Sequence, residues 1–229
     1  MTFTEVAPGV YARRHEELDL TTGLVVGHTR CLVIDTRGDH KQGADLVEAV
    51  RAVTDLPWHV VLTHPHFDHY FGTREFFPCE VWAHQSFRVD IGDQAVWAGR
   101  YREMGEEDVA RAIETTTVVG PNRSFADRRE LDLGGRTVVL HHFGHAHSFS
   151  DTVVHVPDAD VVFAGDLVEV PELTDESFGD GDVTNWPTVL DALLALEPRI
   201  VVPGHGDPVD ADFVVRQRAV LSAGSTSAR

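Results

Sequence analysis

An apolar run that ends in a cluster of histidines constrains this chain more than any other feature of its sequence. Residues Val60 to Leu62 are apolar and mostly β-branched, and Thr63 to His69 read T-H-P-H-F-D-H. The apolar half predicts a buried strand, and the polar half predicts the loop in which that strand ends. Imidazole nitrogens and carboxylate oxygens are the ligands that zinc and similar metals prefer. The stretch therefore predicts a metal site, with a polar loop that is merely rich in histidine as the alternative.

Length and composition predict one domain. The chain has 229 residues, of which 42% are hydrophobic, and this is enough for one sizeable core. No linker rich in serine, glycine and proline divides it, so the predicted domain covers residues 1–221, with a disordered tail at 222–229. The formal net charge of −18 would repel phosphate backbones and anionic membranes. We therefore expect a small-molecule substrate rather than a nucleic acid or a membrane, and nothing indicates a homo-oligomer.

The cysteines and the N-terminus bear on the compartment. Cys31 and Cys79 belong to no C-x-x-C pair, which favours buried or free thiols over a mutual disulfide. The first ten residues contain neither a basic segment nor a long apolar one, and no apolar run reaches the length of a membrane span. These features predict a cytoplasmic protein.

The order of strand and helix patterns favours two sheets with helices outside them. Short apolar or alternating runs predict strands within residues 3–11, 24–28, 31–35, 59–62, 80–83, 130–133, 137–142, 151–156, 161–164 and 199–202. Apolar residues at helical spacing predict helices within 42–53, 86–99, 106–115, 188–196 and 211–221. Residues 172–183 are acidic and contain glycine, so they predict a loop.

Several of these strands end at potential metal ligands. After the strand that ends at Leu62, the same pattern recurs at His142, which precedes His147, and at Val202, which precedes His205. The run that ends at Ala164 is likewise followed by Gly165 and Asp166. Strands that deliver polar side chains at one edge can bring them to a single point. Each group alone is weak evidence, since a Gly-Asp pair after a strand is more often an ordinary turn.

Together these segments resemble the motifs of the metallo-β-lactamase-fold hydrolases. Residues 63–69 match T-H-x-H-x-D-H, residues 144–148 are similar to G-x-x-H-[ST], residues 163–167 to F-x-G-D-x, and residues 203–206 to P-G-H-G. The motifs follow in the family's order and cover nearly the whole chain. The resemblance implies an α+β fold, a four-layer αββα sandwich of two mixed β-sheets flanked by helices, with the metals at one edge.

The resemblance also implies the metal ligands. The first metal would be held by His64, His66 and His147, and the second by Asp68, His69 and His205. Asp166 would bridge the two. The cofactors implied are two divalent ions, with zinc expected and iron or manganese as alternatives.

Two histidines, His145 and His147, are candidates for the same ligand position. His145 competes with His147, and we favour His147 because Ser148 follows it and Asp151 lies four residues on, as in the family. His145 would then line the pocket or lie on the surface. Asp35 and Asp151 are predicted to orient ligand imidazoles.

The implied reaction is hydrolysis of an ester, thioester, lactone or amide bond. Two nearby divalent ions can share a water and lower its pKa, which gives a hydroxide nucleophile, and Asp68 can accept or return a proton. The ligand set is nearer to the glyoxalase II and lactonase branches than to the β-lactamases that use cysteine, because neither Cys31 nor Cys79 follows a matching strand. True β-lactamase activity, a sulfur dioxygenase-like enzyme with one iron, and a non-catalytic metal-binding protein are the alternatives.

Overall fold

A computed structural model of the chain describes residues 2–227, without the side chains of residues 175, 176 and 224–227. Its first sheet has seven strands that pair in chain order: β1 (Thr4–Ala7), β2 (Val10–Arg14), β3 (Thr21–Val26), β4 (Cys31–Ile34), β5 (Trp58–Val61), β6 (Val81–His84) and β7 (Arg123–Phe125). The pairs are antiparallel from β1 to β4 and parallel from β4 to β7. Because parallel neighbours need a crossover, helices lie between these later strands.

The second sheet contains five strands in the spatial order β12-β11-β10-β9-β8. Their bounds are β8 (Arg128–Asp132), β9 (Thr137–His141), β10 (Val153–Val156), β11 (Val161–Glu169) and β12 (Ile200–His205). Only β11 and β12 are parallel, so this sheet is also mixed. The parallel strands β5, β11 and β12 and the antiparallel strand β9 carry or lead into the polar motifs.

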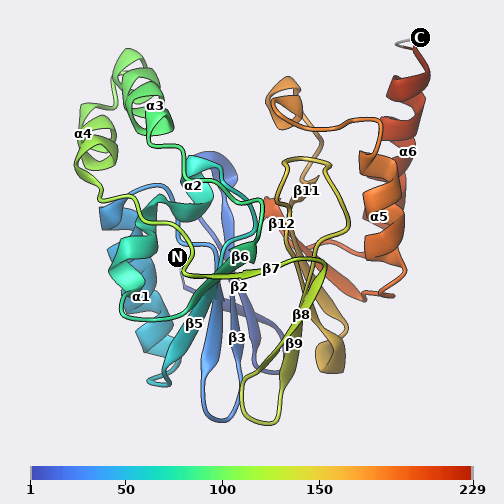
Figure 1. Cartoon of the computed structure of the whole chain (residues 1–229), viewed down its shortest axis with the longest axis horizontal. Coiled ribbons are helices and arrows are strands. Elements are labelled where there is room, and N and C mark those ends of the chain that lie inside the picture. The colour runs from blue at the N-terminus through green and yellow to red at the C-terminus, as the bar shows by residue number, and fades with distance from the viewer. Residues whose placement is uncertain (1, 228–229) are drawn as a thin grey trace.

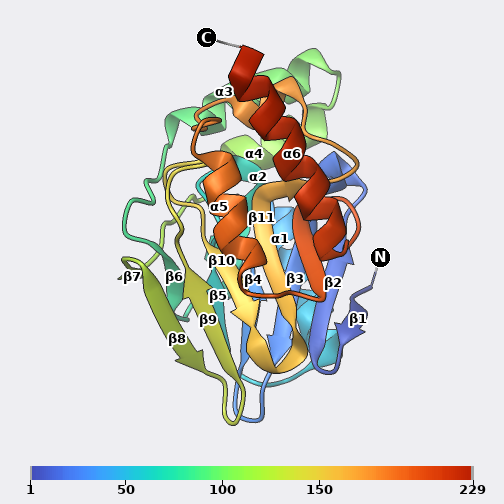
Figure 2. The ribbon, with the colours of Figure 1, turned by 90° about the vertical axis from the view of Figure 1, so that its right-hand side faces the viewer.

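Helices cover the outer face of each sheet (Figures 1 and 2). On the side of the first sheet lie α1 (His40–Val53), α3 (Gly92–Glu103) and α4 (Glu107–Thr115), and on the side of the second lie α5 (Trp186–Leu194) and α6 (Ala211–Ser227). The short helix α2 (Phe67–Tyr70) follows the histidine loop at the upper edge of the sheets in Figure 1. This arrangement confirms the predicted α+β sandwich with two mixed β-sheets between helical layers.

Three apolar clusters hold the layers together. One lies between the sheets and includes Ile34, Leu140 and Phe163, which are at most 2% exposed. The other two lie under the helices of each side, with Leu46 of α1 in one and Leu190 of α5 in the other, both fully buried. Such a two-sided core explains why the central strands read as nearly continuous apolar runs.

Helix α1 shows how the local sequence fixes one of these elements. The Asp39 carboxylate accepts hydrogen bonds from the backbone N–H groups of Lys41 (2.7 Å) and Gln42 (2.9 Å), which caps the helix N-terminus. Leu46 and Val50, one turn apart, point into the core. In the described part of the chain, no helix has the length and apolarity that crossing a membrane would require.

The structure moves some predicted boundaries. Strand β11 does not stop at Ala164 but continues to Glu169, with an irregular register around Gly165, so Asp166 lies within a strand. Helix α3 begins at Gly92, later than the predicted 86–99. Helix α6 continues to Ser227 instead of ending at residue 221, so most of the predicted disordered tail is helical. Residues 228 and 229 lie outside the described residues.

Candidate metal centre

All seven side chains predicted as ligands meet at one edge of the sandwich. They come from the connection between β5 and α2, the first turn of α2, the loop between β9 and β10, strand β11 and the end of β12: His64, His66, Asp68, His69, His147, Asp166 and His205. Two groups result, in each of which the ligating atoms lie within 4.8 Å of one another. We call His64, His66, His147 and Asp166 the first group, and Asp68, His69 and His205 the second group.

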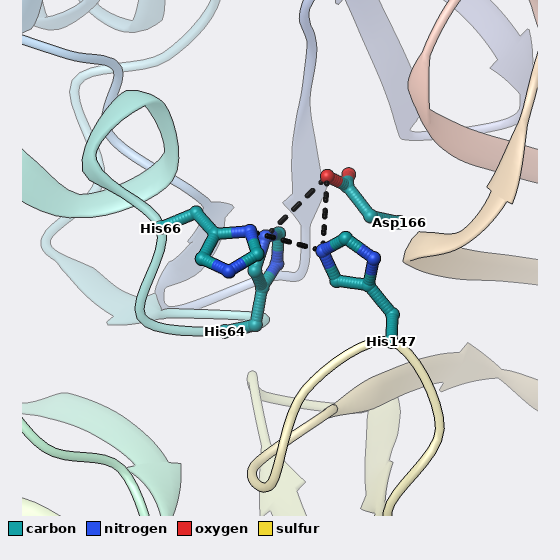
Figure 3. A group of neighbouring side chains, drawn as sticks. All are labelled: His64, His66, His147 and Asp166. Atoms are coloured by element: carbon teal, nitrogen blue, oxygen red, sulfur yellow. Dashed lines mark hydrogen bonds and ion pairs between the residues drawn. The ribbon is translucent and has the colours of Figure 1, made fainter. Parts of the chain in front are cut away.

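In the first group, three imidazoles and one carboxylate point toward one another (Figure 3). The Nε2 atom of His147 lies 3.0 Å from Nδ1 of His66 and 3.5 Å from Oδ2 of Asp166. His64 Nε2 is 3.4 Å from the same carboxylate oxygen. His64 and His147 are almost fully buried, whereas the His66 side chain is 34% exposed, so the group opens to solvent on the side of His66.

The second group lies against the first through Asp166. The Nε2 atom of His205 is 3.5 Å from Oδ2 of Asp68, and His69 Nε2 is 3.7 Å from the same oxygen. Asp166 extends its Oδ1 to within 3.2 Å of His69 Nε2 and its Oδ2 to within 3.3 Å of His205 Nε2. A single carboxylate therefore faces the histidines of both groups.

Hydrogen bonds to the outer ring nitrogens fix which nitrogen faces inward. A backbone carbonyl can only accept, so His147 donates from Nδ1 to Ser177 O (3.1 Å), and His205 donates from Nδ1 to Leu18 O (2.7 Å). His66 donates from Nε2 to Asp180 Oδ1 (3.2 Å). Each neutral ring then presents an unprotonated nitrogen to the centre of the site.

The buried carboxylate of Asp35 fixes the orientation of the other two imidazole rings, those of His69 and His64. It accepts from His69 Nδ1 (2.8 Å), from the backbone N–H of Thr63 (2.8 Å) and from the Thr63 hydroxyl (2.7 Å). Because the Thr63 hydroxyl donates to Asp35, it accepts from His64 Nδ1 at 3.0 Å. The prediction that Asp35 orients a ligand ring agrees with this geometry, and Thr63 extends the effect to a second ring.

These residues fit divalent metal ions. With both outer nitrogens donating, His66 Nδ1 and His147 Nε2 direct lone pairs at each other across 3.0 Å, an arrangement that a cation between them would stabilise. His64 Nε2 and Asp166 Oδ1 are buried and lack a hydrogen-bond partner among the described residues. Imidazole and carboxylate donors are also those that zinc, iron and manganese accept.

Burial and the nearby carboxylates shift the pKa values of the site histidines in opposite directions. Burial lowers the pKa of His147 to about 4, and lowers that of His64 well below its usual range. Burial also opposes the charged form of His205, but Asp166 and Asp68 outweigh it and raise the pKa to about 9. Burial would raise the pKa of Asp166, yet His69, His205 and His64 hold it well below its ordinary value. Asp166 and Asp68 therefore place negative charge beside His205, which a bound cation would also balance.

The remaining predicted residues have other positions. His145 lies outside both groups and donates from Nε2 to the backbone carbonyl of Asp180 (2.7 Å). Asp151 touches no ligand ring; its carboxylate accepts from the Ser148 hydroxyl (2.6 Å) and from the backbone N–H groups of Ser148 and Ala146, so it shapes the loop that carries His147. The prediction that Asp151 orients a ligand imidazole was therefore wrong, because its carboxylate contacts the loop and not a ligand ring.

The P-G-H-G motif has glycine at position 204 because no side chain fits there. Gly204 precedes His205 in β12, and a Cβ atom built there would overlap Oδ1 of Asp166. The two parallel strands can approach at this point only because no side chain stands at position 204. Cys31 and Cys79 belong to neither group of ligands, and neither forms a disulfide.

The sequence did not predict the loop residues that accept hydrogen bonds from the outer nitrogens of the ligand histidines. Two are backbone carbonyls, of Leu18 and Ser177, and such groups leave no signature in a sequence. Asp180 lies in the acidic segment 172–183, which the sequence predicted as a loop, and Gly179 and Gly181 flank it.

Comparison with known proteins agrees with the class that the fold and the site define, an αββα protein with a histidine and aspartate metal centre. The family model described as "Metallo-beta-lactamase superfamily" matches residues 18–205. The chain belongs to this superfamily, whose named relatives include lactamases and metallo-hydrolases, and it is an enzyme of the metallo-hydrolase class.

Two curated relatives and one solved structure illustrate the range of similarity. A metallo-beta-lactamase type 2 of Bacteroides fragilis is 30% identical over 105 residues, which are 44% of this chain and 42% of that protein. The probable metallo-hydrolase YqgX of Bacillus subtilis (strain 168) is 25% identical over 191 residues, covering 81% of this chain and 84% of the relative. A metallo-beta-lactamase from Pontibacter korlensis superposes with a TM-score of 0.73 at 18% identity over 96% of this chain and 98% of its own.

Proposed function

We propose that the protein is a hydrolase with two metal ions, most simply zinc, that cleaves an ester, thioester, lactone or amide bond of a small molecule. The observation that carries this proposal is the position of Asp166, whose carboxylate faces histidines of both ligand groups. A carboxylate shared in this way suits two adjacent divalent ions. Complete donor sets on both sides favour this function over a non-catalytic binding protein.

The first group would hold one ion and the second group the other, with Asp166 between them. Bound there, the two ions would supply a hydroxide nucleophile near neutral pH and polarise the substrate carbonyl. Asp68 directs Oδ2 toward His205 and His69, while its Oδ1 makes no hydrogen bond to the described residues. We assign Oδ1 as the atom that accepts a proton during attack and returns it to the leaving group.

Substrate class follows only broadly from the ligands. The absence of cysteine from both described groups, and the presence of Asp166, favour lactone, ester or thioester substrates over those of the cysteine-ligand lactamases. The names of the relatives from Bacteroides fragilis and Pontibacter korlensis keep the β-lactam amide among the bonds to be tested. The acidic chain, with its net charge of −18, disfavours phosphodiesters of nucleic acids.

Metal analysis tests the proposal first. Protein purified without added metal should contain about two zinc ions per chain and should hydrolyse at least one member of a panel of lactone, thioester, ester and β-lactam substrates. One iron per chain with oxygen consumption on a persulfide substrate would instead identify a dioxygenase. Protein with neither metal nor hydrolytic activity after zinc is added would contradict the proposal.

A further inference from the structure

One short segment contacts two histidines of the first group and the residue before one of them. In the segment Ser177–Asp182, the Ser177 carbonyl accepts from His147 Nδ1 (3.1 Å), and the Asp180 carboxylate accepts from His66 Nε2 (3.2 Å). The backbone N–H of Asp182 donates to Ala146 O (2.7 Å), directly before His147 in the chain. The segment therefore contacts two of the three histidines that the first group uses.

A hydrogen bond from His145 holds the same segment in place. Its Nε2 donates to the Asp180 carbonyl (2.7 Å), and its own carbonyl accepts from the Asn185 side chain (2.8 Å). Its ring stacks on Phe149, with ring centroids 3.9 Å apart. Gly181 lies so close to the 146–147 backbone that a Cβ atom would come within 2.6 Å of Ala146 O. Position 181 thus needs glycine for the segment to close against the loop that carries His147.

Among the described residues, no surface segment supports the ring of His69 in this way. That ring is fully buried and held by the buried Asp35, which the β4 strand positions. The Asp180 and His66 side chains, in contrast, are 45% and 34% exposed. A hydrogen bond between exposed groups forms and breaks easily unless another interaction holds both partners in place.

We infer that Asp180 is a positioning residue for the first group, and that closure of the Ser177–Asp182 segment and metal binding by that group stabilise each other. The carboxylate holds the His66 ring so that Nδ1 faces His147 and Asp166, which an unrestrained ring would do only part of the time. By linkage, a metal ion that fixes His66 and His147 must favour the closed segment to the same extent as the segment favours the metal. The inference rests on the metal-binding part of the proposed function.

Zinc titration of Asp180 variants tests the role of the carboxylate. Competition with a chromogenic chelator should show that Asp180→Ala weakens one of the two zinc sites about 10- to 100-fold and leaves the other unchanged. Asp180→Asn keeps an acceptor oxygen without the charge, so we expect an intermediate loss. Glu172→Gln removes a charge from the same acidic loop at an exposed position and should leave both affinities unchanged. In a His205→Ala background, which disables the second group, Asp180→Ala should weaken the one zinc site that remains.

Hydrogen exchange tests the reciprocal effect. Mass spectrometry of the peptide covering residues 172–186 should show faster deuterium uptake after zinc is removed by a chelator, and Asp180→Ala with zinc bound should show an uptake between those two states. Peptides from β4 and β5 serve as internal controls and should change least.

The outcomes separate this inference from the proposed function. Two tight zinc sites with wild-type affinity in Asp180→Ala, or equal exchange of the 172–186 peptide with and without zinc, would overturn the inference and leave the hydrolase proposal intact. A wild-type chain that binds no zinc would overturn both. Circular dichroism of each variant identifies a folding defect, and Asp180→Asn then provides the comparison.

Discussion

The two sheets contribute to the site in different ways. The first sheet supplies four of the seven ligating side chains within residues 64–69, and the buried Asp35 on the neighbouring strand fixes two of their rings directly or through Thr63. The second sheet supplies the other three from separate segments, and two of these rings depend on carbonyls of loops, at Ser177 and Leu18. In the first half, His64 and His69 are thus fixed from adjacent parallel strands and only His66 relies on a distant loop, through Asp180. Both rings of the second half depend on loops that close from elsewhere in the chain.

Asp166 joins the halves, so replacing it should have the largest effect. We expect Asp166→Ala to lose both metal ions and all measurable turnover, because its carboxylate faces both groups. His66→Ala should abolish turnover yet keep the metal of the second group. Elemental analysis of the purified variants measures this difference. Equal metal content in Asp166→Ala and wild type would remove Asp166 from the ligand set.

The comparison of Asp35 with Asp151 should give the next largest effect. The Asp35 carboxylate accepts from a ligand ring, whereas the Asp151 carboxylate accepts from Ser148 and the backbone of the loop that carries His147. Asp35→Asn should therefore weaken metal binding about 10- to 100-fold. Asp151→Asn should mainly lower the free energy of unfolding, by about 1–3 kcal/mol. Chelator competition and urea unfolding of the metal-free proteins separate the two, and matching metal affinities in both variants would contradict the distinction.

Thr63 provides a smaller test of the first half. Thr63→Val removes the hydroxyl that donates to Asp35 and accepts from His64. Because the His64 ring is buried, an unpaired Nδ1–H should cost about 1–3 kcal/mol of stability. Urea denaturation of the metal-free variant measures this loss. Thr63→Ser, which keeps the hydroxyl, is the control, and a similar loss in both variants would point to packing instead.

His15 should give the smallest effect, and it tests the half of the site that the second sheet supplies. It lies at the base of the loop that carries Leu18, where its Nε2 is 3.0 Å from the Thr22 hydroxyl. Burial, then Arg37 and Arg13, lowers the pKa of His15 to about 2 from 6.5. Between those pH values the unfolded chain binds a proton that the folded chain does not, so this contribution to stability is complete above pH 6.5 and decreases as the pH falls.

Replacing His15 should remove that pH dependence. Between pH 7 and pH 5 the wild type should lose up to about 2 kcal/mol more stability than His15→Gln. Urea unfolding at the two pH values measures the difference, with His28→Gln at a solvent-accessible position as the control. Parallel stability curves for wild type and His15→Gln would show that this ring does not resist protonation.

What the sequence could predict follows the same division. The histidine loop was predictable because four potential metal ligands follow one buried strand, and the positions of most strands and helices along the chain followed from apolar periodicity. The continuation of β11 beyond Asp166 was not, because Gly165 is a turn signal that here marks an irregular register within the strand. The contacts of Leu18, Ser177 and Asp180 were also beyond prediction, since they depend on how distant loops meet.

Gly204 has a consequence for how this enzyme can vary. Even a methyl group at this position would occupy the place of the Asp166 carboxylate oxygen. Substitutions at 204 cannot adjust the site gradually, because the smallest side chain already displaces the residue that faces both ligand groups. Directed evolution toward new substrates should therefore accept changes at exposed positions such as Glu172, and reject every change at position 204.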